Sequence, residues 1–224
     1  APADLRIAAL ECLGPRRGQL EPAAFELLVG HLADSADPLL RVAAARTIGG
    51  HRPSNEQLLA LGPHVANAGP LIVPLLAPAF SHSSDPKVGQ ILVDALKESP
   101  GTDALSGDEL RKLLSRYSPE VQATAQPLLE KLAAREHQQE LYLTQLVNRT
   151  LGTPGNPERG RQVFFSQKVG CAGCHRLEGK GGNVGPDLSL IGRIRDPRAL
   201  LEAVVFPSST IVPEYRSYTI AGKD

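Results

Sequence analysis

Two of the three cysteines of this 224-residue chain, Cys171 and Cys174, stand in the stretch CAGCH and are followed directly by His175. On one helical turn, such a pair of thiols can bond to the two vinyl groups on one porphyrin edge, while the imidazole ligates the iron. The same residue types also form half of a zinc site or a redox dithiol. The pentapeptide by itself therefore leaves three chemistries open: covalent haem, structural zinc and thiol–disulfide exchange.

The stretches on either side of this motif resemble those of class I cytochromes c. Before it, ERGRQVFF (158–165) places Gly160 and Phe164 on one face of a predicted helix. This resembles the N-terminal helix of that family, where glycine allows a close helix crossing and the aromatic ring packs near the haem edge. After the motif, GGNVGPDLSLIGR (181–193) resembles the family's segment Gly-Pro-x-Leu-x-x-x-x-Gly-Arg.

This resemblance implies roles for further residues. The carbonyl of Pro186 would accept a hydrogen bond from Nδ1 of His175, which would orient the ring and strengthen it as a ligand. Leu188 and Ile191 would wall the haem, and Arg193 would pair with a propionate. We therefore expect a covalent haem c whose iron is ligated by the imidazole of His175.

The two other chemistries find less support in the sequence. A structural zinc site needs four ligands, and no Cys or His follows His175. A thioredoxin-like pair follows a strand and opens a helix, whereas here a glycine-rich loop comes after the pair. The remaining cysteine, Cys12, lies in an apolar helical pattern, so we expect it to be a small buried side chain.

The elements before the motif are predicted to be helices. Apolar residues recur at three- and four-residue spacing in 4–14, 23–33, 37–50, 55–66, 85–99, 106–117 and 118–134. Several of these stretches begin with Asp-Pro or Ser-Pro, an N-cap side chain followed by proline at the first helical position. A long polar helix and a linker are expected over 135–160.

A weak internal repeat runs through these helices. Four dipeptides each open an apolar helix, and they recur at intervals of about 35, 46 and 33 residues. These dipeptides are Arg6-Ile7, Arg41-Val42, Lys87-Val88 and Glu120-Val121. DPLLRVAAARTIGG (37–50) resembles the first helix of a HEAT repeat. We therefore predict a mainly α protein with two domains. Residues 1–152 would form a HEAT-like helical-repeat solenoid, with an irregular helical bundle as the alternative, and residues 153–224 a small, incomplete α-helical cytochrome c domain.

The whole arrangement resembles a family of exported haem-binding proteins of planctomycetes and verrucomicrobia. The matching features are helical repeats, then GRQVFFSQKVGCAGCH and GPDLSLIGR, then DPRALLEAVVFPSSTIVPEYRSYTIAGKD. Many members carry a propeller-type dehydrogenase domain before the repeats. The resemblance implies a linked or partner dehydrogenase as electron donor, so that any catalysis would belong to sequence outside this chain; within it we predict no catalytic residue.

The sixth iron position is the open question, because the chain contains no Met. In the family resembled, the Met follows a small β insertion that begins with YRSYTIAGKD (215–224), which alternates as a strand would; we expect the chain to end early relative to its gene product. The position could be open, filled from within by a Lys or by a His such as His137, or filled by another chain.

Composition limits the function further. Lys and Arg number 24, as do Asp and Glu, so the net charge offers no general attraction to nucleic acid or anionic membranes. No apolar run is long enough to cross a bilayer.

Because haem c is attached outside the bacterial cytoplasm, we expect a periplasmic or other extracytoplasmic location. An electron-transfer module is the favoured function, and a haem enzyme or a binding protein for gas or peroxide, with an open iron, is the alternative.

Overall fold

The computed structural model describes residues 2–17, 19–33 and 36–207, and it is mainly helical. Contacts divide the chain into two compact units, Ala1–Glu136 and His137–Asp224, which we call unit 1 and unit 2. The strand expected over 215–224 lies outside the described residues. In the described part of the chain, no helix is both long and apolar enough to span a membrane.

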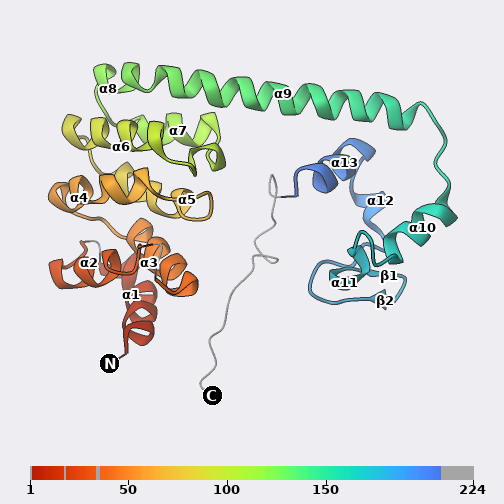
Figure 1. The fold of residues 1–224 in the computed structure, drawn as a ribbon, viewed down its shortest axis with the longest axis horizontal. Coiled ribbons are helices and arrows are strands. Elements are labelled where there is room, and N and C mark those ends of the chain that lie inside the picture. Colours follow the sequence, from red (N-terminus) through yellow and green to blue (C-terminus); the bar gives the residue numbers. More distant parts are fainter. Residues whose placement is uncertain (1, 18, 34–35, 208–224) are drawn as a thin grey trace. The chain divides into compact units, whose positions relative to one another are not determined.

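Unit 1 consists of helices that stack in successive layers (Figure 1). Its elements are α1 (Ala3–Arg17), α2 (Pro22–Val29), α3 (Pro38–Gly50), α4 (Asn55–Ala66), α5 (Val73–Leu76), the 3-10 helix η1 (Ala77–His82), α6 (Pro86–Glu98), the 3-10 helix η2 (Thr102–Ala104), α7 (Gly107–Leu114), α8 (Pro119–Thr124) and the first part of α9 (Gln126–Leu151). Helix α1 packs on α3, α3 on α5, α4 on α6, and α6 on α8. The core lies between these layers.

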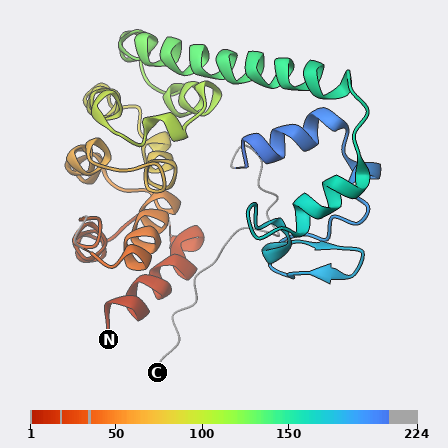
Figure 2. The same ribbon diagram turned by 45° about the vertical axis from the view of Figure 1, so that its right-hand side comes forward.

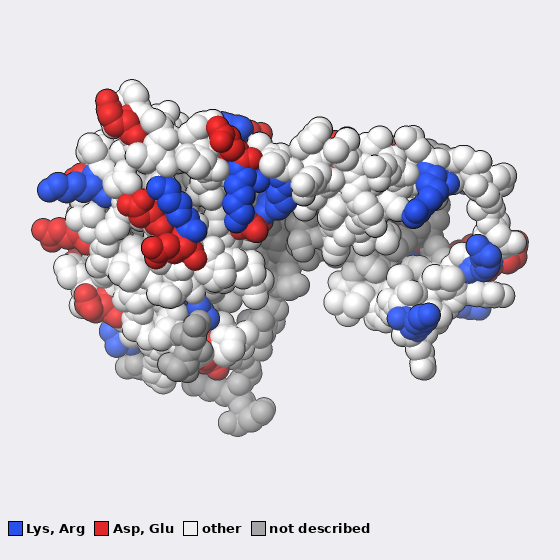
Figure 3. Space-filling model, turned by 45° about the horizontal axis from the view of Figure 1, so that its top comes forward, with Lys and Arg blue, Asp and Glu red and all other residues white. Residues whose placement is uncertain are grey.

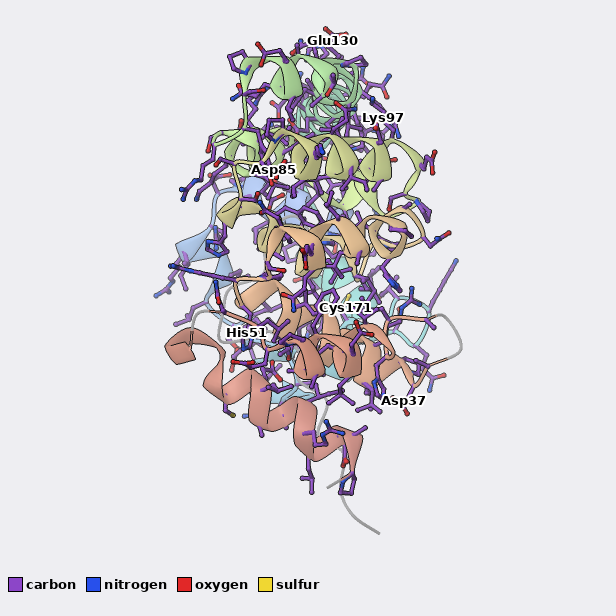
Figure 4. All side chains as sticks on the ribbon, turned by 90° about the vertical axis from the view of Figure 1, so that its left-hand side faces the viewer. Asp37, His51, Asp85, Lys97, Glu130 and Cys171 are labelled. Atoms are coloured by element: carbon purple, nitrogen blue, oxygen red, sulfur yellow. The ribbon has the colours of Figure 1, made fainter. Side chains whose placement is uncertain are left out.

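At the helix starts with Asp-Pro or Ser-Pro discussed here, the side chain before the proline caps the helix as predicted, with one exception. Asp37 and Asp85, both labelled in Figure 4, accept hydrogen bonds of 2.8 Å from the backbone N–H groups of Leu39 and Lys87, and proline follows each aspartate. Ser118 also precedes proline, but its side chain makes no capping hydrogen bond. Sequence inspection missed the reciprocal capping boxes at the starts of α4 and α7.

The stretch predicted as one helix over 118–134 is two helices. Helix α8 ends at Thr124, and α9 begins at Gln126 and continues without a break to Leu151. Pro127 explains the division, because proline has no N–H to donate and its ring clashes with the carbonyl four residues earlier. The polar helix expected after residue 135 is thus the continuation of α9.

Cys12 is exposed, so the prediction of a buried side chain is wrong. On α1, Ile7 is the buried contact with the core, and Leu10 packs partly against it. At 3.6 residues per turn, position 12 lies well away from the face that carries these two residues.

Two adjacent glycines at the end of α3 provide a matched test of packing in unit 1. A Cβ on Gly49 would lie 1.8 Å from the carbonyl oxygen of Leu75, whereas a Cβ on Gly50 would meet nothing within 4 Å. We expect Gly49→Ala to lower the free energy of unfolding of unit 1 by about 1–3 kcal/mol. Gly50→Ala should leave it unchanged or raised, because alanine favours helices.

Urea unfolding of the full chain, followed by the helical circular dichroism signal, measures this difference. Equal midpoints for the two variants would contradict the close approach of α3 to α5.

Unit 2 contains the second part of α9, then α10 (Pro157–Phe165), α11 (Cys171–Cys174), β1 (Arg176–Leu177), β2 (Lys180–Gly181), α12 (Ile191–Ile194) and α13 (Pro197–Val205). The two short strands are antiparallel and form the hairpin drawn beside α11 in Figure 2.

Helix α13 packs on the second part of α9, which explains why residues 137–151 belong to unit 2. Arg198 donates to both carboxylate oxygens of Glu140 at 2.5 Å, and the rings of Tyr142 and Phe206 meet edge to face with centroids 6.4 Å apart. The division therefore falls inside α9. The domain boundary at residues 152 and 153 stays a prediction about the sequence.

Candidate haem-attachment site

A short helix presents the two thiols. Helix α10 begins at an asparagine cap, with Asn156 accepting from the N–H of Arg159 at 2.8 Å, and ends at Phe165. Gly170 then adopts φ of 67°, a left-handed conformation that suits glycine, and starts the single turn α11. The thiols of Cys171 and Cys174 are free, the first half-buried and the second exposed.

His175 follows this turn, and its ring is held by one hydrogen bond. Nδ1 lies 2.9 Å from the carbonyl oxygen of Pro186, the contact that the resemblance implied. Because a carbonyl oxygen only accepts, Nδ1 must carry the proton. In the neutral ring Nε2 then keeps its lone pair, which is the state an imidazole needs to ligate a metal.

Three glycines that sequence inspection did not single out pack closely against the motif. A Cβ on Gly185 would lie 2.6 Å from Cε1 and 2.7 Å from Nδ1 of His175. On Gly182 it would lie 2.1 Å from the carbonyl oxygen of Gly173, and on Gly181 it would lie 2.3 Å from that of His175. The only sequence signal was the density of glycine in GKGGNVG.

The backbone of this glycine loop is bonded to α11. The carbonyl of Cys174 accepts from the N–H groups of Val184 and Gly185 at 3.0 and 2.8 Å, and that of Ala172 accepts from Gly182 at 2.8 Å. The loop thus lies against the two-cysteine turn and brings Pro186 to the histidine ring.

A second set of contacts joins α10 to the hairpin. Arg161 forms an ion pair with Glu178, and its guanidinium carbon lies 5.4 Å from the ring centroid of Phe165. Phe165 in turn meets Phe164 edge to face, with centroids 5.0 Å apart. The sequence offered no signal for this cluster beyond the aromatic pair.

The carboxyl of Asp187, next to the proline, is stabilised in its charged form. The hydroxyl and N–H of Ser189 donate to it at 2.5 and 2.8 Å. These two bonds, with a smaller contribution from the charge of Arg176, hold the pKa of Asp187 below its usual range.

The other residues suggested by the resemblance are placed as follows. Phe164, Leu188 and Ile191 are half-buried, and Arg193 is exposed on α12. A Cβ on Gly160 would meet nothing within 4 Å, so the described residues make no close helix crossing there.

The apolar surface of unit 2 is poorly covered by its own residues. Between residues 137 and 207, Leu143 is the one buried side chain among those the structure describes, at 3% exposure. Val184 and Ile194 are 79% and 72% exposed, and the aromatic pair on α10 is only half-buried. A free thiol pair, an imidazole with an available Nε2 and uncovered apolar side chains together fit a large apolar macrocycle attached at this motif.

The alternatives to haem lack their usual structural settings. No group of three or more His, Cys, Asp or Glu side chains that could hold a metal ion occurs in the described part of the chain. Helix α10 and a turn, rather than a strand of a βαβ unit, precede Cys171.

The other histidines have ordinary environments. Nδ1 of His31 and of His51 bonds to the carbonyl four residues earlier, at 2.8 and 2.7 Å. Burial lowers the pKa of His64 and of His82, and two nearby arginines lower that of His82 further. His137, in unit 2, is exposed on α9.

Comparison with known proteins identifies the segment that carries this site. Residues 157–214 match the family model for cytochrome c. No curated protein and no solved structure matches the chain. A cytochrome c domain carries a covalently bound c-type haem with iron, and the matched segment includes both thiols and the histidine described above.

Proposed function

We propose that the chain is an electron-transfer module with one c-type haem, which is bonded to Cys171 and Cys174 and ligated by His175. The observation that carries the proposal is the 2.9 Å contact between Nδ1 of His175 and the carbonyl of Pro186, directly after two free thiols. When bound, the haem supplies reversible one-electron chemistry at its iron.

The protein residues have four tasks in this proposal. The two thiols hold the macrocycle permanently, and the Pro186 carbonyl fixes the tautomer and direction of the histidine ring. Leu188, Ile191 and Phe164 cover its apolar faces. Arg193 remains the candidate for a propionate, because its guanidinium is exposed and charged.

The sixth iron position remains to be assigned, and no Met of this chain can fill it. His137 is our candidate within the chain, since it belongs to the same unit as His175 and is exposed. The alternatives are a lysine of the chain, an open position or a ligand from another chain.

We further propose a setting for the module. Residues 1–152 would form a HEAT-like spacer that presents the haem domain, 153–224, to a redox partner or to a linked dehydrogenase of the planctomycete type. The stacked helix pairs of unit 1 support a spacer role. Its visible surface mixes both signs of charge (Figure 3), which gives no reason to expect nucleic acid as a partner. Because haem c attachment takes place outside the bacterial cytoplasm, we propose a periplasmic or other extracytoplasmic location.

The second candidate function is a haem enzyme or a binding protein for gas or peroxide. The observation that favours it is the absence of Met, since an open iron binds small molecules.

One experiment separates these functions. The chain is produced with a periplasmic haem-attachment system, its intact mass is measured, and oxidised and reduced spectra are recorded with and without carbon monoxide. The electron-transfer proposal expects the mass of one added haem and a low-spin spectrum that carbon monoxide does not change. A protein without haem would overturn both functions, and a spectrum that carbon monoxide shifts would favour the second.

The same spectra test the sixth ligand. His137→Ala should convert the low-spin spectrum to high-spin if His137 ligates the iron. His82→Ala, an exposed histidine of unit 1, is the matched control.

A further inference from the structure

Three contacts join the segment after the cysteines, His175 to Glu178, to the segment Pro186 to Ser189. The first is the bond from Nδ1 of His175 to the Pro186 carbonyl at 2.9 Å. The second is a backbone bond from the N–H of Leu188 to the carbonyl of Arg176 at 2.8 Å, part of a parallel bridge. The third runs from the N–H of Glu178 to Oγ of Ser189 at 2.7 Å.

Only the third contact depends on a side chain outside the proposed iron ligand. Oγ of Ser189 accepts from the backbone of Glu178 and donates to Oδ1 of Asp187 at 2.5 Å, and the N–H of Ser189 donates to the same oxygen at 2.8 Å. The residue that bears the histidine's acceptor, Pro186, is bonded directly to Asp187. Ser189 therefore fixes both the far end of the pairing and the residue next to the acceptor carbonyl.

Glu178 lies in the two-residue turn of the β1–β2 hairpin, where it and Gly179 both have positive φ, as a type I′ turn requires. Glu178 has φ of 50°, and it is the one non-glycine residue with positive φ in the described ranges. Such a conformation costs a non-glycine residue about 1–2 kcal/mol. Its carboxylate is paired with Arg161 of α10, so the residue is held from both sides. The turn therefore presents the N–H of Glu178 to Oγ of Ser189.

We propose that Ser189 is a positioning residue for the haem site: it holds the Pro186 carbonyl against Nδ1 of His175 and so sets the reduction potential of the iron. The inference rests on the proposed function, in which His175 ligates the iron. It goes further by naming a residue, not adjacent to the motif, that controls the ligand.

The direction of the effect follows from the chemistry of the imidazole. A strong hydrogen bond from Nδ1 makes the ring more electron-rich and a better donor through Nε2, which favours the ferric state and lowers the potential. Removing Oγ of Ser189 would let the Pro186 carbonyl move, weaken that bond and raise the potential. Ser189 carries no charge, so its replacement leaves the formal charge of the site unchanged.

The test uses the haem-loaded full chain with Ser189→Ala, Ser189→Thr and the control Ser166→Ala. Thr retains the hydroxyl, and the hydroxyl of Ser166 donates to the Val163 carbonyl at the end of α10, away from Pro186 and Asp187. Two quantities are measured: the reduction potential, and the hydrogen-exchange rate of the His175 Nδ1 proton by NMR. We expect Ser189→Ala to raise the potential and to speed exchange about tenfold, as for the loss of one hydrogen bond, and Ser189→Thr and the control to stay near the unmodified chain.

Unchanged potential and exchange in Ser189→Ala would overturn the proposal, as would equal shifts in the Ala and Thr variants. If the Ala variant fails to load haem while the Thr variant loads it, the proposal is supported; if both fail, it is overturned. Spectra of the unmodified chain keep the two proposals apart, because a haem that is absent or not ligated by His175 defeats the proposed function before any variant is compared.

Discussion

Replacing both Cys171 and Cys174 by Ser is expected to abolish covalent haem. A serine hydroxyl does not add to a haem vinyl group under conditions in which a cysteine thiol does, so the intact mass should equal that of the polypeptide alone. The single variant Cys12→Ser should still carry one haem, because Cys12 is an exposed thiol in unit 1, outside the matched segment.

The same double variant should weaken unit 2 selectively. Leu143 is the one buried side chain described there, so we expect the haem to supply much of the apolar contact that stabilises unit 2. Limited proteolysis should therefore cleave the double variant between residues 152 and 207 much faster than the unmodified chain, while unit 1 resists equally in both. Full haem content in the double variant would show that the two thiols do not hold the group, and equal cleavage rates would show that unit 2 does not depend on it.

Gly185→Ala is expected to damage the ligand without touching the thiols. The added Cβ would lie 2.6 Å from Cε1 of the His175 ring, closer than real Cβ contacts come. The ring must turn away, which breaks its hydrogen bond to Pro186; overpacking of this kind costs about 1–3 kcal/mol. We expect covalent haem to remain, with a raised reduction potential and a partly high-spin spectrum.

The matched control for Gly185→Ala lies inside the motif itself. A Cβ on Gly173, between the two cysteines, would meet nothing within 4 Å, so Gly173→Ala should keep the spectrum and potential of the unmodified chain. Identical spectra for the two variants would contradict the close packing of Gly185 on the histidine ring.

The cofactor could be predicted from the sequence, since the family match bears out a cytochrome c domain with covalent haem. Thiol and imidazole spacing on one helical turn is a local property, and local geometry follows from residue order. The mainly helical architecture could be predicted for the same reason, from apolar spacing and from proline after aspartate. The split of 118–134 was also local: Pro127 marked it, and we overlooked it.

Cys12 shows where a local pattern fails. An apolar helical pattern placed Cys12 in the core, yet the buried face of α1 is defined by which side meets α3, and that is a tertiary contact. The close helix crossing that the resemblance implies for Gly160 stays a prediction.

The chemistry of the motif and the helical nature of the chain thus follow from residue order, because both depend on residues within one or two turns of each other. The groups that position this chemistry depend instead on how the chain folds back on itself. The contact of Gly185 with the imidazole and the bond from Glu178 to Ser189 join segments separated by a loop, and no spacing rule specifies how such a loop folds back.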